Sequence, residues 1–155
     1  MDQTWTTALK GSISDTFSTM FFVVPEPDSE WEARLPTLPP EPWLEGTVDL
    51  SLQGKEMRVW VWAPENLARE LAANILTCEP EQLSQDDLLD SYREMLNMVA
   101  GSLLTQVDTD SSGNMGLPQA QLLPQGEPVS FSSQAQSLLV FDAEGKPLLA
   151  GWAVI

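Results

Sequence analysis

The amino-acid sequence predicts a single α+β domain over residues 1–155, with a largely antiparallel sheet packed against long helices. Apolar residues recur at helical spacing near the start of the chain and again over residues 86–107. Segments with strictly alternating apolar residues lie between and after these two stretches. The resulting order of helix, two strands, two helices and further strands is typical of α+β proteins rather than of repeated strand–helix–strand units. A length of 155 residues with 43% hydrophobic content is enough for one core.

The first predicted element is a helix over residues 1–22. Its apolar residues recur every four positions and so share one helical face: Trp5, Leu9, Ile13 and Phe17. The next segment, residues 25–43, holds six of the twelve prolines. Because proline lacks the backbone N–H that helices and central strands need, this segment is predicted to be a long loop or an irregular edge.

Residues 47–52 and 56–63 are predicted to form a β-hairpin, because apolar and polar residues alternate along both segments. Gln53, Gly54 and Lys55 connect them. Trp60 and Trp62 fall on the face opposite the aliphatic residues of their strand. The second face of this hairpin must therefore be covered, either by a helix or by a partner chain.

Two helices and a group of strands are predicted for the rest of the chain. Pro64 and Glu65 suit the first turn of a helix that runs to Leu76, and a longer helix covers residues 86–107. Asp86 and Asp87 open the longer helix, where carboxylates favour the helix dipole and cap free N–H groups. The remaining predicted strands are Ala120–Leu123, Val129–Ser132, Ser137–Phe141 and Leu148–Val154.

The charge of the chain limits its partners. With 23 acidic and 7 basic residues the formal net charge is −16, which repels nucleic acids and anionic membranes. The start of the chain lacks the features of a leader peptide, and no apolar run is long enough to span a membrane, so we expect a cytoplasmic protein. The chain has one cysteine, Cys78, and no histidine. Any chemistry must therefore use carboxylates, amides or hydroxyls.

A narrow line of polar and small residues runs along the helix predicted over residues 86–107. Asp90, Glu94, Asn97 and Gly101 are separated by four, three and four positions. At about 100° per residue they share a stripe about 60° wide, opposite the apolar side of the helix. Asparagine and glycine are weak helix formers, which indicates that something other than helix stability retains them. Gly101 would let another chain approach closely beside Glu94 and Asn97.

The residues around this line resemble a known family. "EMLNMVAG", after "LSQDDLLDSYR", resembles the CheX branch of the CheC-like chemotaxis phosphatases, whose ExxN motif on a long helix is the catalytic signature. The likeness extends over residues 46–155, through "GTVDLSL", "APENLARELAANIL" and the closing "LLVFDAEG" and "PLLAGWAVI", and the opening helix is also similar. The resemblance implies a CheC-like fold.

The resemblance also implies a function. The substrate would be the phospho-aspartate of a CheY-like receiver domain, with Asn97 orienting the attacking water and Glu94 docking the receiver through a lysine. Asp90 and Gly101 would be partner-binding residues. The chain would hold no metal or cofactor of its own, because Mg²⁺ would belong to the receiver. The alternative is a non-catalytic receiver-binding or scaffold module, of the kind that related flagellar switch proteins provide, or more remotely a structural dimerisation domain.

Two further implications concern assembly and a missing contact. Members of this branch pair through sheet edges, and the apolar final strand "LLAGWAVI" is near an end of the chain, so a homodimer is expected. Family members often carry lysine three residues after the helix glycine, where this chain has Leu104. A contact made by that lysine would be missing here.

Three other patterns have simpler interpretations. Residues 108–119 nearly match a calcium-binding loop, with Asp108, Asp110 and Ser112 in ligand positions, but Gln119 replaces the final glutamate and Pro118 obstructs the next helix. We expect a solvated turn there. Cys78 has no second cysteine and is expected to be an inert thiol. Asp15 and Ser18 in the first helix echo the spacing of Glu94 and Asn97, either as a degenerate copy or as ordinary helix surface.

Overall fold

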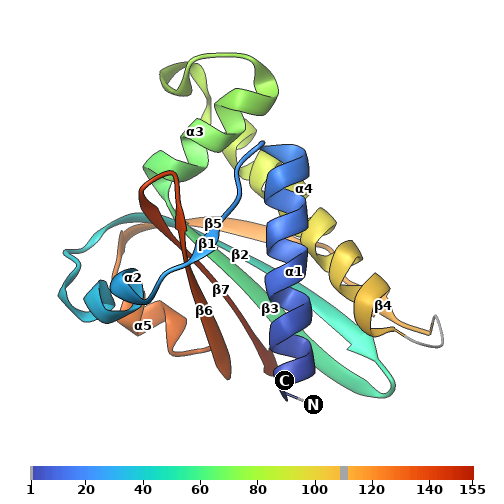
Figure 1. The fold of residues 1–155 in the computed structure, drawn as a ribbon. Coiled ribbons are helices and arrows are strands. Elements are labelled where there is room, and N and C mark those ends of the chain that lie inside the picture. Colours follow the sequence, from blue (N-terminus) through green and yellow to red (C-terminus); the bar gives the residue numbers. More distant parts are fainter. Residues whose placement is uncertain (1, 109–111) are drawn as a thin grey trace.

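The computed structural model describes residues 2–108 and 112–155, and shows an antiparallel sheet with helices on both faces (Figure 1). The helices are α1 (Asp2–Met20), α2 (Ser29–Arg34), α3 (Glu65–Leu76), α4 (Gln85–Val107) and α5 (Pro128–Ser132), with 3₁₀ turns η1 (Leu35–Thr37) and η2 (Pro80–Gln82). The strands are β1 (Glu26–Pro27), β2 (Glu41–Leu52), β3 (Lys55–Pro64), β4 (Asn114–Met115), β5 (Gln119–Gly126), β6 (Ser137–Ala143) and β7 (Lys146–Val154). The α+β prediction is confirmed.

The strands form one sheet in the order β1-β6-β7-β3-β2, and β4 and β5 both pair with the other side of β2. All of these pairs are antiparallel. The predicted hairpin is present as β2 and β3, with Leu52 opposite Lys55. Gln53 and Gly54 have positive φ angles of 51° and 77°, which the tight connection requires and which glycine adopts without strain.

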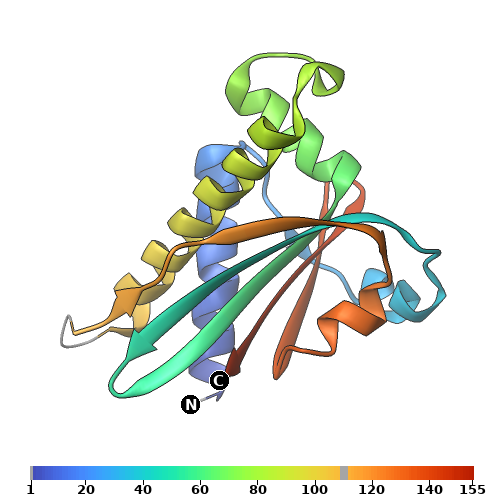
Figure 2. The ribbon, with the colours of Figure 1, turned by 180° about the vertical axis from the view of Figure 1, so that it is seen from behind.

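The two faces of the sheet carry different cores. Helices α1, α3 and α4 cover the aliphatic face, where Val59 and Val61 of β3 are fully buried. On the opposite face Trp60 and Trp62 stack with ring centroids 5.9 Å apart, and Phe131 of α5 packs on Trp62. Figure 2 shows α5 and α2 beside this second face. The sequence predicted that a helix or a partner chain covers this face. Residues of α2, η1 and α5 from the same chain pack on the tryptophans.

Of the two alternatives predicted for residues 25–43, the long loop is wrong, and the irregular edge is confirmed by the two-residue strand β1, which is outermost in the sheet and pairs with β6. The segment contains β1, α2 and η1, and β2 already begins at Glu41. Asp28 caps α2 by accepting a hydrogen bond from the Trp31 N–H at 2.8 Å, and the Trp31 indole donates to Asp142 of β6 at 2.7 Å. Together with the buried Leu35, these contacts place the segment over the tryptophan cluster, so its prolines shape a cover rather than a free loop.

A second prediction, of a strand over Val129–Ser132, is wrong because these residues belong to the short helix α5. Pro128 occupies the first turn, where its missing N–H costs nothing, and Phe131 turns inward. A segment of five residues is too short for alternation and helical spacing to be distinguished. Phe131 packs on the rings of Trp43 and Trp62, whereas Val129 is 50% exposed.

The proposed route to a homodimer also needs correction. The final strand β7 pairs with β3 on one side and with β6 on the other, so its edges are both occupied inside the chain. It is fully buried over Leu148–Ala150 because it is a central strand. Among the described strands, the sheet edges left for a homodimer are the β4–β5 side and the β1–β6 side, and the homodimer itself stays a prediction.

Candidate functional site

Helix α4 carries the candidate site, and its ends are determined locally. The Ser84 hydroxyl accepts a hydrogen bond from the Asp87 N–H at 3.0 Å and so caps the first turn. Asp86 and Asp87 are exposed in that turn, where they complement the helix dipole as expected. The helix runs without interruption to Val107, so Glu94, Asn97 and Gly101 all lie in regular helix.

The opposite side of α4 is held against the sheet by a close approach to Gly46 of β2. A Cβ atom at Gly46 would lie 2.3 Å from Cδ1 of Leu96 and 2.7 Å from Cε2 of Tyr92, so only glycine fits. The Tyr92 hydroxyl donates to the Val61 carbonyl at 2.9 Å. Complete burial, and secondarily the nearby Glu45 charge, raise the pKa of Tyr92 well above its ordinary value, so it stays a neutral donor. These contacts fix which face of α4 points outward.

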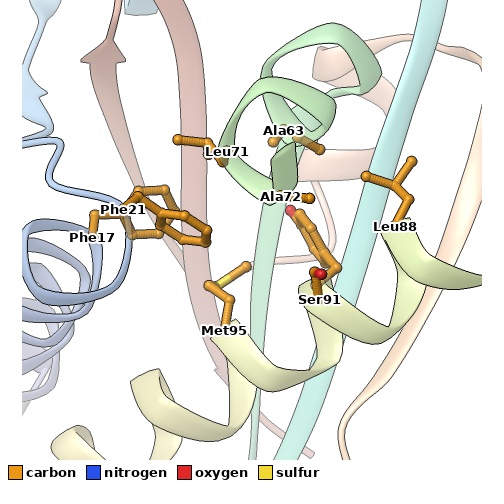
Figure 3. Close-up of a pocket in the computed structure, with 10 residues that line it drawn as sticks. Phe17, Phe21, Ala63, Leu71, Ala72, Leu88, Ser91 and Met95 are labelled. Carbon is orange, nitrogen blue, oxygen red and sulfur yellow. The ribbon is translucent and has the colours of Figure 1, made fainter. Parts of the chain in front are cut away.

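A narrow cavity separates α4 from α1 and α3 near the site. Figure 3 shows Phe17 and Phe21 on the α1 side, Leu71 on α3, and Ser91 and Met95 on α4 around it. Its volume of about 10 Å³ leaves room for one water molecule at most. A small-molecule substrate therefore does not fit here, and any chemistry at α4 must take place on its outer surface.

The predicted site residues lie on that outer surface. Glu94 is exposed, and Asn97 and Gly101 are half-buried. Within residues 2–108 and 112–155 the side chains of Glu94 and Asn97 make no hydrogen bond or ion pair, so both are available to a partner. A Cβ atom at Gly101 would meet nothing within 4 Å, so the glycine is not there for internal packing.

Asp90 differs from the other predicted residues. It is exposed, but its carboxylate forms an ion pair with Arg93, three positions later on the same helix. Arg93 is not part of the polar line predicted from the sequence. Acid and base three positions apart on a helix are within reach of each other, so the signal for this pair is present in the sequence. The structure thus adds a cation next to the site.

Another acidic residue, Glu45 of β2, is held in place by the fold and contrasts with Glu94. It is 8% exposed and accepts hydrogen bonds from Trp62 Nε1 at 2.9 Å and from Gln121 Nε2 at 2.8 Å. Gln134 adds a longer contact of 3.4 Å. Glu45 therefore connects β2 to β3, β5 and the segment after α5. Glu94 has no such role within the fold.

Asp49 and Arg58 form another charged pair on the same face as Glu45, at 2.7 Å between Oδ1 and Nε. The hydrogen bond from Arg58, opposed by partial burial, lowers the pKa of the Asp49 carboxyl, and the same bond raises the pKa of Arg58. Both side chains are about 40% exposed, so the pair contributes little to stability. It links neighbouring strands across the sheet from α4 and takes no part in the candidate site.

The alternative sites receive no support from the described residues. Asp108 accepts a hydrogen bond from the Gly113 N–H at 2.9 Å, as in a turn, while Asp110 lies outside the described residues. No group of three or more acidic, cysteine or histidine residues in residues 2–108 and 112–155 is placed to hold a metal ion. Cys78 is half-buried and free. No helix in the described part of the chain has the length and apolar character needed to cross a bilayer.

Comparisons with known proteins place this geometry in context. A family model described as chemotaxis phosphatase CheX matches residues 46–140. A comparison with curated proteins gives no match.

Among solved structures, CheX from Vibrio vulnificus is similar over 97% of this chain and 96% of its own, at 15% identity and a TM-score of 0.74. A CheC-like superfamily protein from Shewanella sp. PV-4 is similar over 100% and 99%, at 14% identity and 0.74. A CheX–CheY–BeF3–Mg²⁺ complex from Borrelia burgdorferi is similar over 97% and 97%, at 14% identity and 0.67. At such identities the likeness shows the fold.

Proposed function

The chain belongs to the CheX family of chemotaxis phosphatases, and on that premise we propose that it hydrolyses the phospho-aspartate of a CheY-like receiver, with Asn97 orienting the attacking water and Glu94 docking the receiver. The observation that carries the proposal is the outer face of α4. Glu94 and Asn97 stand one helical turn apart there, Glu94 exposed and Asn97 half-buried, and both side chains are unpartnered among the described residues. The solved complex of a CheX with a CheY supports the choice of partner.

The proposed chemistry suits an amide. The Asn97 carbonyl can accept a hydrogen bond from water while its NH₂ group donates to a phosphoryl oxygen, which aligns the water for in-line attack. An amide is a poor base, so its contribution is positioning, which reaches about 7–11 kcal/mol only in ideal cases. Asn97 is half-buried, so its side chain has less freedom to lose when it engages a substrate. The metal that neutralises charge on the phosphoryl group is assigned to the receiver.

Docking is assigned to Glu94 because its charge is free. The exposed carboxylate stands with Asp86, Asp87 and Asp90 on the solvent side of α4, and the whole chain carries a net charge of −16. Such a surface attracts a basic patch on a partner and raises the association rate at low ionic strength. A lysine at the mouth of the receiver's site would provide the complementary charge.

The test compares wild type with Asn97→Ala and Glu94→Ala on CheY-like receivers phosphorylated with phosphoramidate. Asn97→Ala is expected to reduce phosphate release at least a hundredfold, toward the receiver's own rate, while binding is retained. Glu94→Ala is expected to act mainly by raising KM. Asn74→Ala, which removes an exposed asparagine from α3, is the matched control and should behave like wild type.

The outcomes separate the proposal from its alternative. Equal hydrolysis rates in wild type, Asn97→Ala and Glu94→Ala would refute the assignment of the site. Binding of the phosphorylated receiver by wild type without any acceleration of phosphate release would instead identify a non-catalytic receiver-binding or scaffold module.

A further inference from the structure

We propose that Arg93 is a third partner-binding residue of this face: it leaves Asp90 when the phosphorylated receiver docks and binds an anionic oxygen of the receiver beside Asn97. This inference rests on the proposed function. Arg93 would supply a positive charge to an anionic group of the receiver. Asn97 is neutral and Glu94 is negative, so neither can supply it.

The placement of Arg93 fits this role. It is the basic residue of α4, in a helix that otherwise carries four acidic residues. At about 100° per residue, Arg93 lies about 40° to one side of Asn97 and one turn before it, while Glu94 lies about 60° to the other side. The outer face of α4 therefore presents a cation, an amide and a carboxylate in that order around the helix.

The current partner of Arg93 holds it loosely. The Arg93 and Asp90 side chains are 38% and 70% exposed, so solvent screens their attraction. Only the Nη2 atom of Arg93 is engaged with Asp90, and Nε and Nη1 have no partner within residues 2–108 and 112–155. An exposed pair on one helix can exchange its partner at little cost when a stronger one arrives.

The chemistry of the substrate provides that stronger partner. A phosphoryl group brings several negative oxygens toward a helix face that already carries Glu94 and Asp90, and like charges at this distance repel. A guanidinium group offers planar, paired N–H donors that match phosphate and carboxylate oxygens. Arg93 is therefore suited to offset the repulsion, and Asp90 acts as a positioning residue that keeps the guanidinium on this face in the free protein.

The experiment measures hydrolysis and binding for wild type, Arg93→Gln and Arg93→Lys. Arg93→Gln is expected to raise KM for the phosphorylated receiver about tenfold and to leave kcat within about twofold. Arg93→Lys keeps the charge and is expected to recover most of the lost affinity. The matched control Arg34→Gln removes the same charge from α2 beside the opposite face of the sheet and should match wild type.

Binding to the receiver with and without BeF3 and Mg²⁺ identifies the anion. If Arg93 binds the phosphoryl group, Arg93→Gln weakens only the BeF3-loaded complex; if it binds a receiver carboxylate, both complexes weaken. Equal KM and affinity for Arg93→Gln, Arg34→Gln and wild type would overturn the inference and leave Arg93 as a helix-surface ion pair. Failure of wild type to accelerate phosphate release would count against the proposed function, whereas the binding measurements still test Arg93.

Discussion

Helices α1 and α4 lie side by side on the same face of the sheet, and each carries an acidic residue three positions before a polar one (Figure 1). In α4 the side chains of Glu94 and Asn97 are unpartnered among the described residues. In α1 the Ser18 hydroxyl donates to the Asp15 carbonyl at 3.2 Å, within its own helix. The same spacing thus yields an open polar face on one helix and an internally bonded turn on the other.

The helices also differ on the C-terminal side of these paired residues. Four positions after Asn97 stands Gly101, inside a helix that continues to Val107. Four positions after Ser18 stands Phe22, which is 87% exposed with a φ of 59°, because α1 has already ended at Met20. A large side chain projects where α4 leaves open space. The difference teaches that spacing identifies a candidate, and that the surrounding backbone decides whether a partner can approach.

The largest expected effect tests how α4 is held. Gly46→Ala places a Cβ 2.3 Å from Leu96, in a packed core, and is expected to lower the free energy of unfolding by about 3 kcal/mol. The matched change in the α1–α4 contact, Gly11→Ala, meets only the flexible end of Gln106 at 3.3 Å and should stay within about 1 kcal/mol of wild type. Urea unfolding followed by tryptophan fluorescence measures both. An equal decrease in the free energy of unfolding for both variants would show that the contact of α4 with β2 is no tighter than its contact with α1.

An intermediate effect is expected at Gly101. Gly101→Ala should raise the free energy of unfolding by about 0.5–1 kcal/mol, because alanine favours helix and nothing obstructs its methyl group. Gly101→Leu should keep the fold but weaken receiver binding about tenfold, since it fills the space beside Asn97. Thermal unfolding and titration with BeF3-loaded receiver measure the two effects, with Asn74→Leu on α3 as control. If Gly101→Leu binds the receiver as tightly as wild type does, Gly101 is not part of the docking surface.

The last prediction is that copying the two residues of the α4 site onto α1 does not change the rate of phosphate release. Asp15→Glu and Ser18→Asn are introduced together into the Asn97→Ala variant. They give α1 a glutamate and an asparagine at the same spacing as Glu94 and Asn97 in α4. We expect phosphate release to stay at the level of Asn97→Ala, because Phe22 and the end of α1 block the approach. Recovery of a tenth of wild-type activity would break the comparison and show that spacing alone makes a site.

Several elements could be predicted because their signals are local. Alternation over residues 47–52 and 56–63 predicts the hairpin of β2 and β3, and helical spacing over residues 86–107 predicts the long helix α4. The elements that could not be predicted are short or depend on distant contacts. Helix α5 turns Phe131 toward Trp62, and α2 is anchored through Trp31 to Asp142, more than a hundred residues away in the chain. No local pattern encodes those partners.

The sequence by itself determined which residues of α4 share a face, because helical geometry follows from residue spacing alone. It also contained the family resemblance and the absence of histidine, which leave amide and carboxylate chemistry. Only the tertiary structure decided that this face stays uncovered while its opposite is buried, since that depends on Gly46 and Val61 of distant strands and on the packing of α1. Burial is a property of contacts between remote segments, so it appears only when the whole chain is folded.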